Sequence, residues 1–283
     1  MFMNRQLILI SNPGNPNDRN YAPSTELALD RWQLFFQSPI GGFWRDNEIR
    51  RFNEQHPLDY EQFQRMISMV LDTVQCDYSI IVFCGHGCST LDGRDAIQLP
   101  IPAPNYNNLF PVDGLLASGV ANVRRTVILD SCRSLVPFTS QQLFEQRQFS
   151  EVYKIDGEEC GKYYNSLIIE SNPHVELLQS TNLHNAAYGS VTGSRYADAV
   201  SLITNQSSIN WKQRALMDRY GQYSYSMLDL HQSVSAHLAA HGNQSPEHHS
   251  TVQLFTSFPF AALHLPNDRT IYNDNAIVEI VED

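Results

Sequence analysis

Two short apolar runs dominate the hydrophobic pattern of the chain. Residues 79–83 (Ser-Ile-Ile-Val-Phe) and 126–129 (Thr-Val-Ile-Leu) show no regular alternation with polar residues. Such runs are typical of strands that are buried on both faces of a parallel sheet. The first run leads into Cys-Gly-His-Gly, which contains His86, and the second into Asp-Ser-Cys, which ends at Cys132. Because ligands of open α/β sheets bind beyond the carboxyl ends of the strands, both polar ends are expected at one crevice.

Segments with helical spacing alternate with the predicted strands. A strand is expected over 5–10, where it meets a dense turn signal. The clearest helices are expected over 59–74 and 225–241, each with an apolar stripe at three- and four-residue spacing. This alternation predicts an α/β fold in which a mostly parallel central sheet carries helices on both faces.

The remaining elements have weaker signals. A helix capped by Ser24 or Thr25 is expected to use Leu27, Leu34 and Phe35 as its apolar positions. Loops are expected over 100–111 and 244–249. Short strands are expected over 49–52, 96–99, 185–192 and 251–255. Helical structure is expected over 113–121 and over part of 163–180.

The composition is that of a globular domain with an acidic surface. The chain has 283 residues, of which 42% are apolar, enough for a full hydrophobic core. Its formal charge of −11 argues against nucleic acid or an anionic membrane as the partner, because both are bound through clusters of Lys and Arg. The same charge favours a cationic substrate.

The cysteines indicate a reducing compartment. Their number, five, is odd, and no Cys-x-x-Cys pair occurs. Cys84, His86 and Cys88 are too close together for a usual structural zinc site, so no metal is expected. The apolar run over 7–10 is too short for a signal peptide, and no window approaches the roughly 20 apolar residues of a membrane span. We therefore expect a cytoplasmic protein.

The ends of the two buried strands supply a candidate nucleophile and a candidate base. A cysteine such as Cys132 reacts as its thiolate, and an imidazole such as that of His86 titrates near neutral pH. The tetrahedral intermediate of acyl transfer also needs hydrogen-bond donors, and the N–H groups of Gly87 and Cys132 are the candidates. Taken singly, a strand cysteine is usually a core residue and a histidine between glycines is often a turn residue. Their joint occurrence at one sheet edge favours catalysis.

The segments that carry these residues resemble the caspase and metacaspase superfamily of cysteine peptidases. SIIVFCGHG is similar to the histidine strand of that superfamily and TVILDSCRS to its cysteine strand, while GNQSPEHHS and GSRYADAV are similar to later segments of metacaspases. The resemblance extends from about Arg5 to His264. It implies a caspase-like three-layer sandwich and a cysteine endopeptidase with a His/Cys dyad. Arg133 and Leu135 stand where metacaspases usually have histidine and glycine.

The resemblance also implies a specificity. In metacaspases, the aspartate at the position of Asp130 lines the pocket for the residue before the scissile bond, and cleavage follows Arg or Lys. A carboxylate matches a guanidinium group through charge-assisted hydrogen bonds. Asp18, in the first strand-end loop, and Asp198 are further candidates for substrate binding. We therefore expect protein or peptide substrates with a basic residue before the cleaved bond.

By the same resemblance, residues 1–283 form a single peptidase domain. Arg147, Lys154 and Lys162 suit self-processing by an enzyme of basic specificity. Calcium activates some metacaspases, but no contiguous loop of acidic oxygen ligands occurs, so no cofactor is predicted and calcium stays open. The expected parts are a large-subunit-like part (about 1–140), a connecting loop (about 141–162), a small-subunit-like part (about 163–265) and a C-terminal tail (266–283).

Two alternatives to a peptidase stay open on the sequence alone. A catalytically silent caspase-like scaffold would bind partner proteins, and an unrelated α/β domain would use its cysteine and histidine structurally. The intact His86, Gly87 and Cys132 favour an enzyme over a scaffold. Control by a regulatory protein or an activating protease, in a bacterial defence or cell-death pathway, is expected from analogy with the family alone.

Overall fold

The computed structural model gives the central sheet and the helices around it. It describes residues 3–17, 21–53, 60–72, 76–89, 95–99, 109–116, 123–132, 155–182, 189–190, 193–204, 222–241, 244–250 and 257–264. All structural statements below refer to these ranges.

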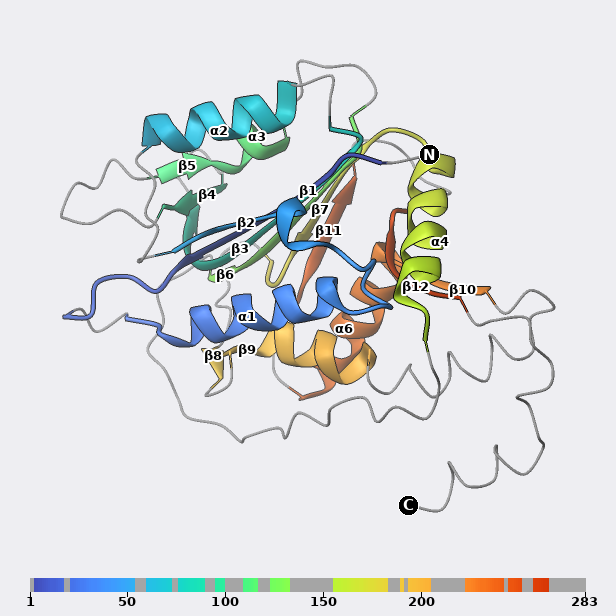
Figure 1. The fold of residues 1–283 in the computed structure, drawn as a ribbon. Coiled ribbons are helices and arrows are strands. Elements are labelled where there is room, and N and C mark those ends of the chain that lie inside the picture. Colours follow the sequence, from blue (N-terminus) through green and yellow to red (C-terminus); the bar gives the residue numbers. More distant parts are fainter. Residues whose placement is uncertain are drawn as a thin grey trace.

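A mostly parallel sheet forms the centre of the molecule (Figure 1). It contains β1 (Arg5–Asn12), β2 (Ile49–Phe52), β3 (Tyr78–Ser89), β4 (Asp95–Gln98), β5 (Leu109–Pro111), β6 (Arg125–Cys132), β7 (Val175–Gln179) and β11 (Glu247–Ser250). The main strand order is β11-β7-β6-β3-β1-β2. Neighbouring strands are parallel from β7 to β2, and β11 is antiparallel to β7. β4 and β5 form a short antiparallel extension at the end of β3.

Helices cover both faces of the sheet, as the alternation of elements predicted. One face packs against α2 (Tyr60–Asp72) and α3 (Val112–Leu116). The other packs against α1 (Ser24–Gln37), α4 (Gly157–Glu170), α6 (Met227–His241) and a helix over 195–204. The remaining elements are η1 (Asp46–Glu48), the pair β8 (Gly189–Ser190) and β9 (Gly193–Ser194), and the pair β10 (Gln222–Ser226) and β12 (Pro259–His264).

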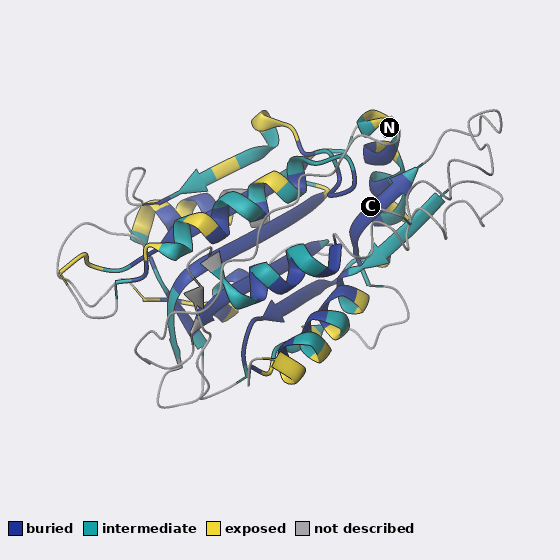
Figure 2. Cartoon of the chain, turned by 90° about the horizontal axis from the view of Figure 1, so that it is seen from below, coloured by how far each residue is buried: buried dark blue, intermediate teal, exposed yellow. Residues whose placement is uncertain are grey.

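The central strands are buried on both sides. In β1, Leu7 and Leu9 belong to the core under α1, whereas Ile8 and Ile10 belong to the core under α2. Figure 2 shows central strands in the buried colour between helices whose outer faces are exposed or intermediate. A strand between two cores needs apolar side chains on both faces, which is the pattern that predicted β3 and β6.

α1 is present where it was predicted, but it buries a different face. Leu27 and Leu34, two of the predicted apolar positions, are 46% and 63% exposed. The helix instead buries Trp32 and Phe36, with Ala28 and Leu29, because the two aromatic rings pack against the ring of Phe260. Its N-cap is Pro23, and neither predicted hydroxyl caps it.

The C-terminal half shows both agreement and correction. The helix predicted over 225–241 is α6, and its apolar stripe is buried, namely Met227, Leu230, Val234 and Leu238. β11 occupies part of 244–249, which was predicted to be a loop, and β7 occupies part of 163–180, which was predicted to be partly helical. β12 was not predicted. The strand predicted over 251–255 lies outside the described residues, and α4 makes 157–162 of the predicted connecting loop helical.

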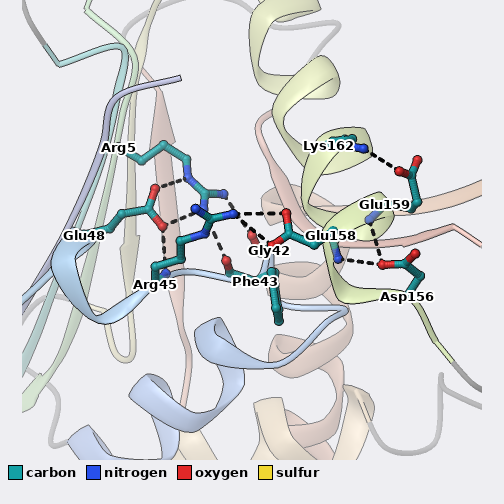
Figure 3. A network of polar contacts seen from close by, with 9 residues as sticks. All are labelled: Arg5, Gly42, Phe43, Arg45, Glu48, Asp156, Glu158, Glu159 and Lys162. Atoms are coloured by element: carbon teal, nitrogen blue, oxygen red, sulfur yellow. Dashed lines mark hydrogen bonds and ion pairs between the residues drawn. The ribbon is translucent and has the colours of Figure 1, made fainter. Parts of the chain in front are cut away.

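A buried arginine joins β1 to the segment between α1 and β2 (Figure 3). Arg5 donates two hydrogen bonds of 2.9 Å to the carboxylate of Glu48. It also donates to the Gly42 carbonyl at 2.9 Å and lies 4.3 Å from the centre of the Trp44 ring. Nearby, Asp156 caps α4 by accepting hydrogen bonds from the backbone N–H groups of its first turn. An exposed ion pair from the same segment to the first turn of α4 completes the network.

Candidate functional site

His86 and Cys132 are directly paired across the two central strands. β3 and β6 are parallel neighbours, and the register places His86 opposite Cys132 and Gly85 opposite Ser131. The sequence predicted that the two residues would meet if their strands were adjacent, and that adjacency is confirmed. His86 is not a turn residue, because β3 continues through Gly-His-Gly to Ser89, while β6 ends at Cys132. The side chain of Cys132 is outside the described parts.

The His86 ring is held from the end of β1. Its Nε2 atom lies 3.1 Å from the carbonyl oxygen of Pro13, which also accepts a hydrogen bond from the Ala22 N–H at 2.7 Å. Gly85 allows β3 to approach β1 here, since a Cβ atom on it would lie 2.6 Å from the Asn12 carbonyl oxygen. Backbone contact between the two strands thus brings Pro13 to the histidine.

The turn that contains Pro13 is itself fixed by a side chain. The Gly14 N–H donates to Asn12 Oδ1 at 3.0 Å, and Gly14 has a φ of 85°, a conformation that favours glycine. Turns of this type are formed by Asn side chains that bond to the backbone two residues later. Asn12 is buried and therefore anchors the turn to the sheet.

The backbone beside Cys132 is fixed by residues that follow β7. The Ser180 hydroxyl donates to the Ser131 carbonyl at 3.3 Å, and the Ser180 N–H donates to the Leu129 carbonyl at 2.9 Å. The Ser180 carbonyl in turn accepts a 2.6 Å hydrogen bond from Gln244 Nε2. Because a peptide unit is planar, fixing the Ser131 carbonyl also fixes the direction of the Cys132 N–H.

Asp130 presents a buried carboxylate two residues before Cys132. The residue is 4% exposed, and its Oδ2 accepts a short hydrogen bond from the Ser194 hydroxyl. Burial raises the pKa of Asp130 to about 6, against the opposing effects of Ser194 and of the nearby Trp32 N–H. Neither that N–H nor the Oδ1 atom of Asp130 has a hydrogen-bond partner among the described residues. The unmatched oxygen is suited to a donor that is brought by a ligand.

The other two predicted carboxylates differ from Asp130. Asp198 lies on the helix over 195–204 and forms an ion pair with Arg31 of α1, in which both side chains are 11% exposed. Its charge is therefore already matched. Asp18 lies outside the described residues.

The described thiols are poor nucleophiles. Burial raises the pKa of Cys76 and of Cys160 to about 11 and that of Cys84 well above its ordinary value. Cys88 is partly exposed, and burial still raises its pKa, with a further contribution from the charge of Asp95. Since the thiolate is the reactive form, these environments suppress reactivity. In the described segments, no group of three His, Cys, Asp or Glu residues is arranged to hold a metal ion, and no helix is long and apolar enough to span a membrane.

Sequence reasoning missed several groups that support His86 and Cys132. The Pro13 carbonyl is a backbone atom and has no residue signature. Ser180 follows β7, which was not predicted, and Ser194 ends β9, just beyond the strand predicted over 185–192. A usable signal was present at Asn12, because an Asn-Pro-Gly sequence after a buried strand indicates a side-chain-stabilised turn at the sheet edge.

Comparison with known proteins identifies the fold. No protein-family model and no curated protein matches the sequence. Among solved structures, caspase-1 from Spodoptera frugiperda is similar over 91% of this chain and 90% of its own, with a TM-score of 0.51 and 13% identity. A protein from Geobacter sulfurreducens is similar over 92% of this chain and 99% of its own, with a TM-score of 0.55 and 12% identity. The chain therefore has a caspase-like α/β sandwich fold, which confirms the predicted fold class.

Proposed function

We propose that the protein is a cysteine endopeptidase that uses Cys132 as nucleophile and His86 as acid and base. The observation that carries the proposal is the register of β3 and β6, which pairs these two residues at the end of the sheet. The Cys132 sulfur attacks the carbonyl carbon of the scissile peptide bond. The C–N bond then breaks as His86 protonates the leaving amine, and water hydrolyses the thioester with His86 as the base.

The Pro13 carbonyl assigns the two ring nitrogens of His86. A carbonyl oxygen only accepts, so the Nε2 atom that lies 3.1 Å from it carries a proton. Nδ1 is then the nitrogen that exchanges a proton with the thiol. Fixing one nitrogen by a second-sphere hydrogen bond is the usual way to select a histidine tautomer. Pro13 thereby orients the ring.

The negative oxygen of the tetrahedral intermediate needs donors at the same sheet edge. The N–H groups of Gly87 and Cys132 are the proposed pair. Gly87 directly follows His86 in the chain, and the second N–H belongs to Cys132 itself. Removal of one donor of this kind lowers kcat about 10²–10³-fold. The hydrogen bonds around Ser131 support a fixed position for the second donor.

We propose cleavage after Arg or Lys, with Asp130 as the anion at the base of the specificity pocket. Its unmatched Oδ1 and its raised pKa both indicate a carboxylate that is incompletely solvated without a cation. A guanidinium or ammonium group would supply the missing donors. We leave Asp198 out of this pocket because Arg31 already pairs with it. Asp18 remains a candidate for the second acidic side chain.

We propose self-processing within the segment before α4. Lys162 lies inside α4 and pairs with Glu159 at 2.5 Å, so a protease would have to unwind the helix to reach the adjacent bond. Arg147 and Lys154 are the remaining candidates. A regulatory protein or activating protease and a defence or cell-death pathway belong to this proposal by family analogy alone, and calcium dependence is left to assay.

The test compares fluorogenic peptides that end in Arg, Lys or Asp, together with a chloromethyl ketone that carries an Arg side chain. The wild-type protein should hydrolyse the basic peptides and lose activity as one reagent attaches to Cys132. Cys132→Ala should be inactive and unlabelled, whereas Cys88→Ala should behave as wild type. A protein that is not hydrolytic and whose thiols all react alike would be a scaffold or an unrelated α/β domain. Preference for Asp would overturn the pocket assignment alone.

A further inference from the structure

Gly87 lies where β3 leaves its parallel neighbours. β3 is paired with β1 up to Gly85 and with β6 up to His86. From Gly87 onward β3 pairs with β4 in antiparallel orientation, with Gly87 opposite Ile97. The position of the Gly87 N–H therefore depends on the position of β4 rather than on the central sheet alone.

Two side-chain amides hold β4, one at each end. They come from β1 and β7, the strands that flank the β3–β6 pair. From β1, Asn12 Nδ2 donates to the carbonyl oxygens of Gln98 at 2.8 Å and Leu99 at 3.3 Å. From β7, Gln179 Nε2 donates to Asp95 Oδ2 at 3.0 Å. Asn12 and Gln179 are only 6% and 3% exposed, so water cannot easily replace either contact. Breaking such a bond leaves a buried polar group without its partner.

The corner of the molecule at Gly87 is incompletely packed. A small pocket lies beside it, and its walls include Gly87, Ser131, Leu129, Asp95 and Gln179. The hydrogen bond between Gln179 and Asp95 joins two of the residues that line this pocket.

Asn12 makes a second contact that Gln179 lacks. Its Oδ1 accepts from the Gly14 N–H and so holds the turn whose Pro13 carbonyl lies against His86. One end of the Asn12 amide thus bears on Gly87, through β4, and the other end on His86. The two ends can be separated by substitution, because an aspartate keeps the acceptor and loses the donor.

We infer that Asn12 and Gln179 are positioning residues that clamp β4 and thereby set the Gly87 N–H for the developing oxyanion. The inference rests on the proposed function, since Gly87 is an oxyanion donor only in an acyl-transfer reaction. It adds to that proposal two buried amides that touch neither the substrate nor the reacting atoms. Asn12 additionally sets His86 through Pro13.

Two reactions of Cys132 separate oxyanion binding from thiolate formation. Hydrolysis of an Arg-ended peptide amide forms a tetrahedral oxyanion and needs the donors. Alkylation by iodoacetamide forms a carbon–sulfur bond as iodide leaves, so no oxyanion develops. We measure kcat and KM for the first reaction and the alkylation rate of Cys132, by peptide mass spectrometry, for the second.

Gln179→Met should lower kcat about tenfold or more, with KM and the alkylation rate within about twofold of wild type. Asn12→Asp should behave in the same way. Asn12→Ala should also slow alkylation, because it removes the acceptor that holds the turn whose Pro13 carbonyl contacts His86. The matched control is Gln37→Met. It breaks a comparable amide–carboxylate hydrogen bond, Gln37 Nε2 to Asp46 Oδ1 at 2.7 Å, on the exposed surface, and should change neither rate.

A pair of charge variants guards against loss of folding. Gln179→Glu places a second carboxylate against that of Asp95 and should lower kcat. In the double variant with Asp95→Asn, the new asparagine donates to the new glutamate, so most of the lost kcat should be recovered. Unchanged kcat in Gln179→Met, equal losses in hydrolysis and alkylation for that variant, or no recovery in the double variant would each overturn the clamp. A wild-type protein that neither hydrolyses peptides nor labels selectively at Cys132 would instead end the proposed function, and this inference with it.

Discussion

His86 and Cys132 occupy one paired position of the β3–β6 ladder, and the His86 ring lies 3.1 Å from the Pro13 carbonyl. A thiol beside such an imidazole ionises below its ordinary pKa of about 8.5. We expect His86→Ala to slow iodoacetamide alkylation of Cys132 at pH 6.5 about tenfold or more and to shift its pH profile upward. The measurement is the labelling rate between pH 5 and 9, with Cys88→Ala as the control. Superimposable profiles for wild type and His86→Ala would contradict the pairing.

Asp130 should make binding of a basic ligand depend on pH. Its carboxyl has a pKa of about 6, because burial disfavours the charged form. An Arg-ended aldehyde inhibitor should therefore bind more weakly as the pH falls through 6, and Asp130→Asn should bind it weakly at every pH. Inhibition constants measured between pH 5 and 8 decide this, with an inhibitor that ends in an uncharged residue as the reference. A pH-independent difference between the two inhibitors would exclude Asp130 from the pocket.

The same carboxylate should cost stability at neutral pH. The folded protein retains a proton on Asp130 that the unfolded chain releases near pH 4. Proton binding at Asp130 therefore stabilises the folded protein at low pH, and this stabilisation is lost as the pH rises through about 6. We expect Asp130→Asn to be more stable than wild type by about 1–3 kcal/mol at pH 7.5 and unchanged near pH 4. Urea unfolding at both pH values measures it.

Asp198 provides the contrasting case for that experiment. Its charge is paired with Arg31, so Asp198→Asn leaves a largely buried guanidinium without its partner. That variant should lose stability at pH 7.5, by about 3 kcal/mol or more. If both substitutions changed stability in the same direction, the distinction between an unmatched and a matched carboxylate would be wrong.

The sequence was sufficient for the strands that carry His86 and Cys132, for physical reasons. A strand between two helical layers must be apolar on both faces, and few other local structures need such a run. Once two such strands are parallel neighbours, their ends lie at the same edge of the sheet. The sequence therefore predicted that the two residues share one sheet edge if their strands are neighbours, whereas the exact register comes from the structure.

The elements that the sequence did not predict depend on long-range partners. β7 contains Glu176, which is fully buried; its Oε1 lies 3.1 Å from His174 Nε2 and accepts a hydrogen bond from the Phe258 N–H at 3.3 Å. β11 is the polar sequence Glu-His-His-Ser, and it is a strand because β7 lies beside it. Local pattern treats such residues as solvated, so neither strand has a recognisable signal. The supporting contact from Pro13 is hidden for a related reason, because it involves a backbone atom.

The Arg5 network offers a test of how α4 is held. Arg5 is 5% exposed and bonds to Glu48, Gly42 and Asn165 at once. Arg5→Met should leave the Glu48 carboxylate largely buried without its partner and cost about 3–5 kcal/mol in urea unfolding. Arg5→Lys should recover only part of this, because an ammonium cannot reproduce the paired hydrogen bonds to the carboxylate.

Figure 3 also contains the control for Arg5. Arg45 pairs with Glu158 at 2.9 Å, but the two side chains are 59% and 57% exposed. Exposed pairs of this kind contribute about 0–1 kcal/mol. Arg45→Met should therefore leave the urea midpoint nearly unchanged. Equal losses for Arg5→Met and Arg45→Met would show that the network does not act through the buried contacts.

His231 should make the protein sensitive to acid. The side chain is 4% exposed on α6, its Nδ1 lies 3.1 Å from the Tyr196 hydroxyl, and its ring centre lies 5.9 Å from that of His248. Burial, together with the neighbouring imidazoles His248 and His249, lowers the pKa of His231 to about 4. The unfolded chain binds this proton from about pH 6.5 downward, so stability is fully present above that pH and falls toward pH 4, by up to about 3 kcal/mol.

His231→Asn should flatten this acid dependence. The asparagine amide offers both an acceptor and a donor to the Tyr196 hydroxyl, but the side chain takes up no proton in this range. Urea midpoints measured from pH 4 to 7.5 should therefore converge with those of wild type at low pH. His241→Asn is the matched control, because His241 is exposed at the end of the same helix. An unchanged slope in His231→Asn, or an equal change in His241→Asn, would place the acid sensitivity elsewhere in the protein.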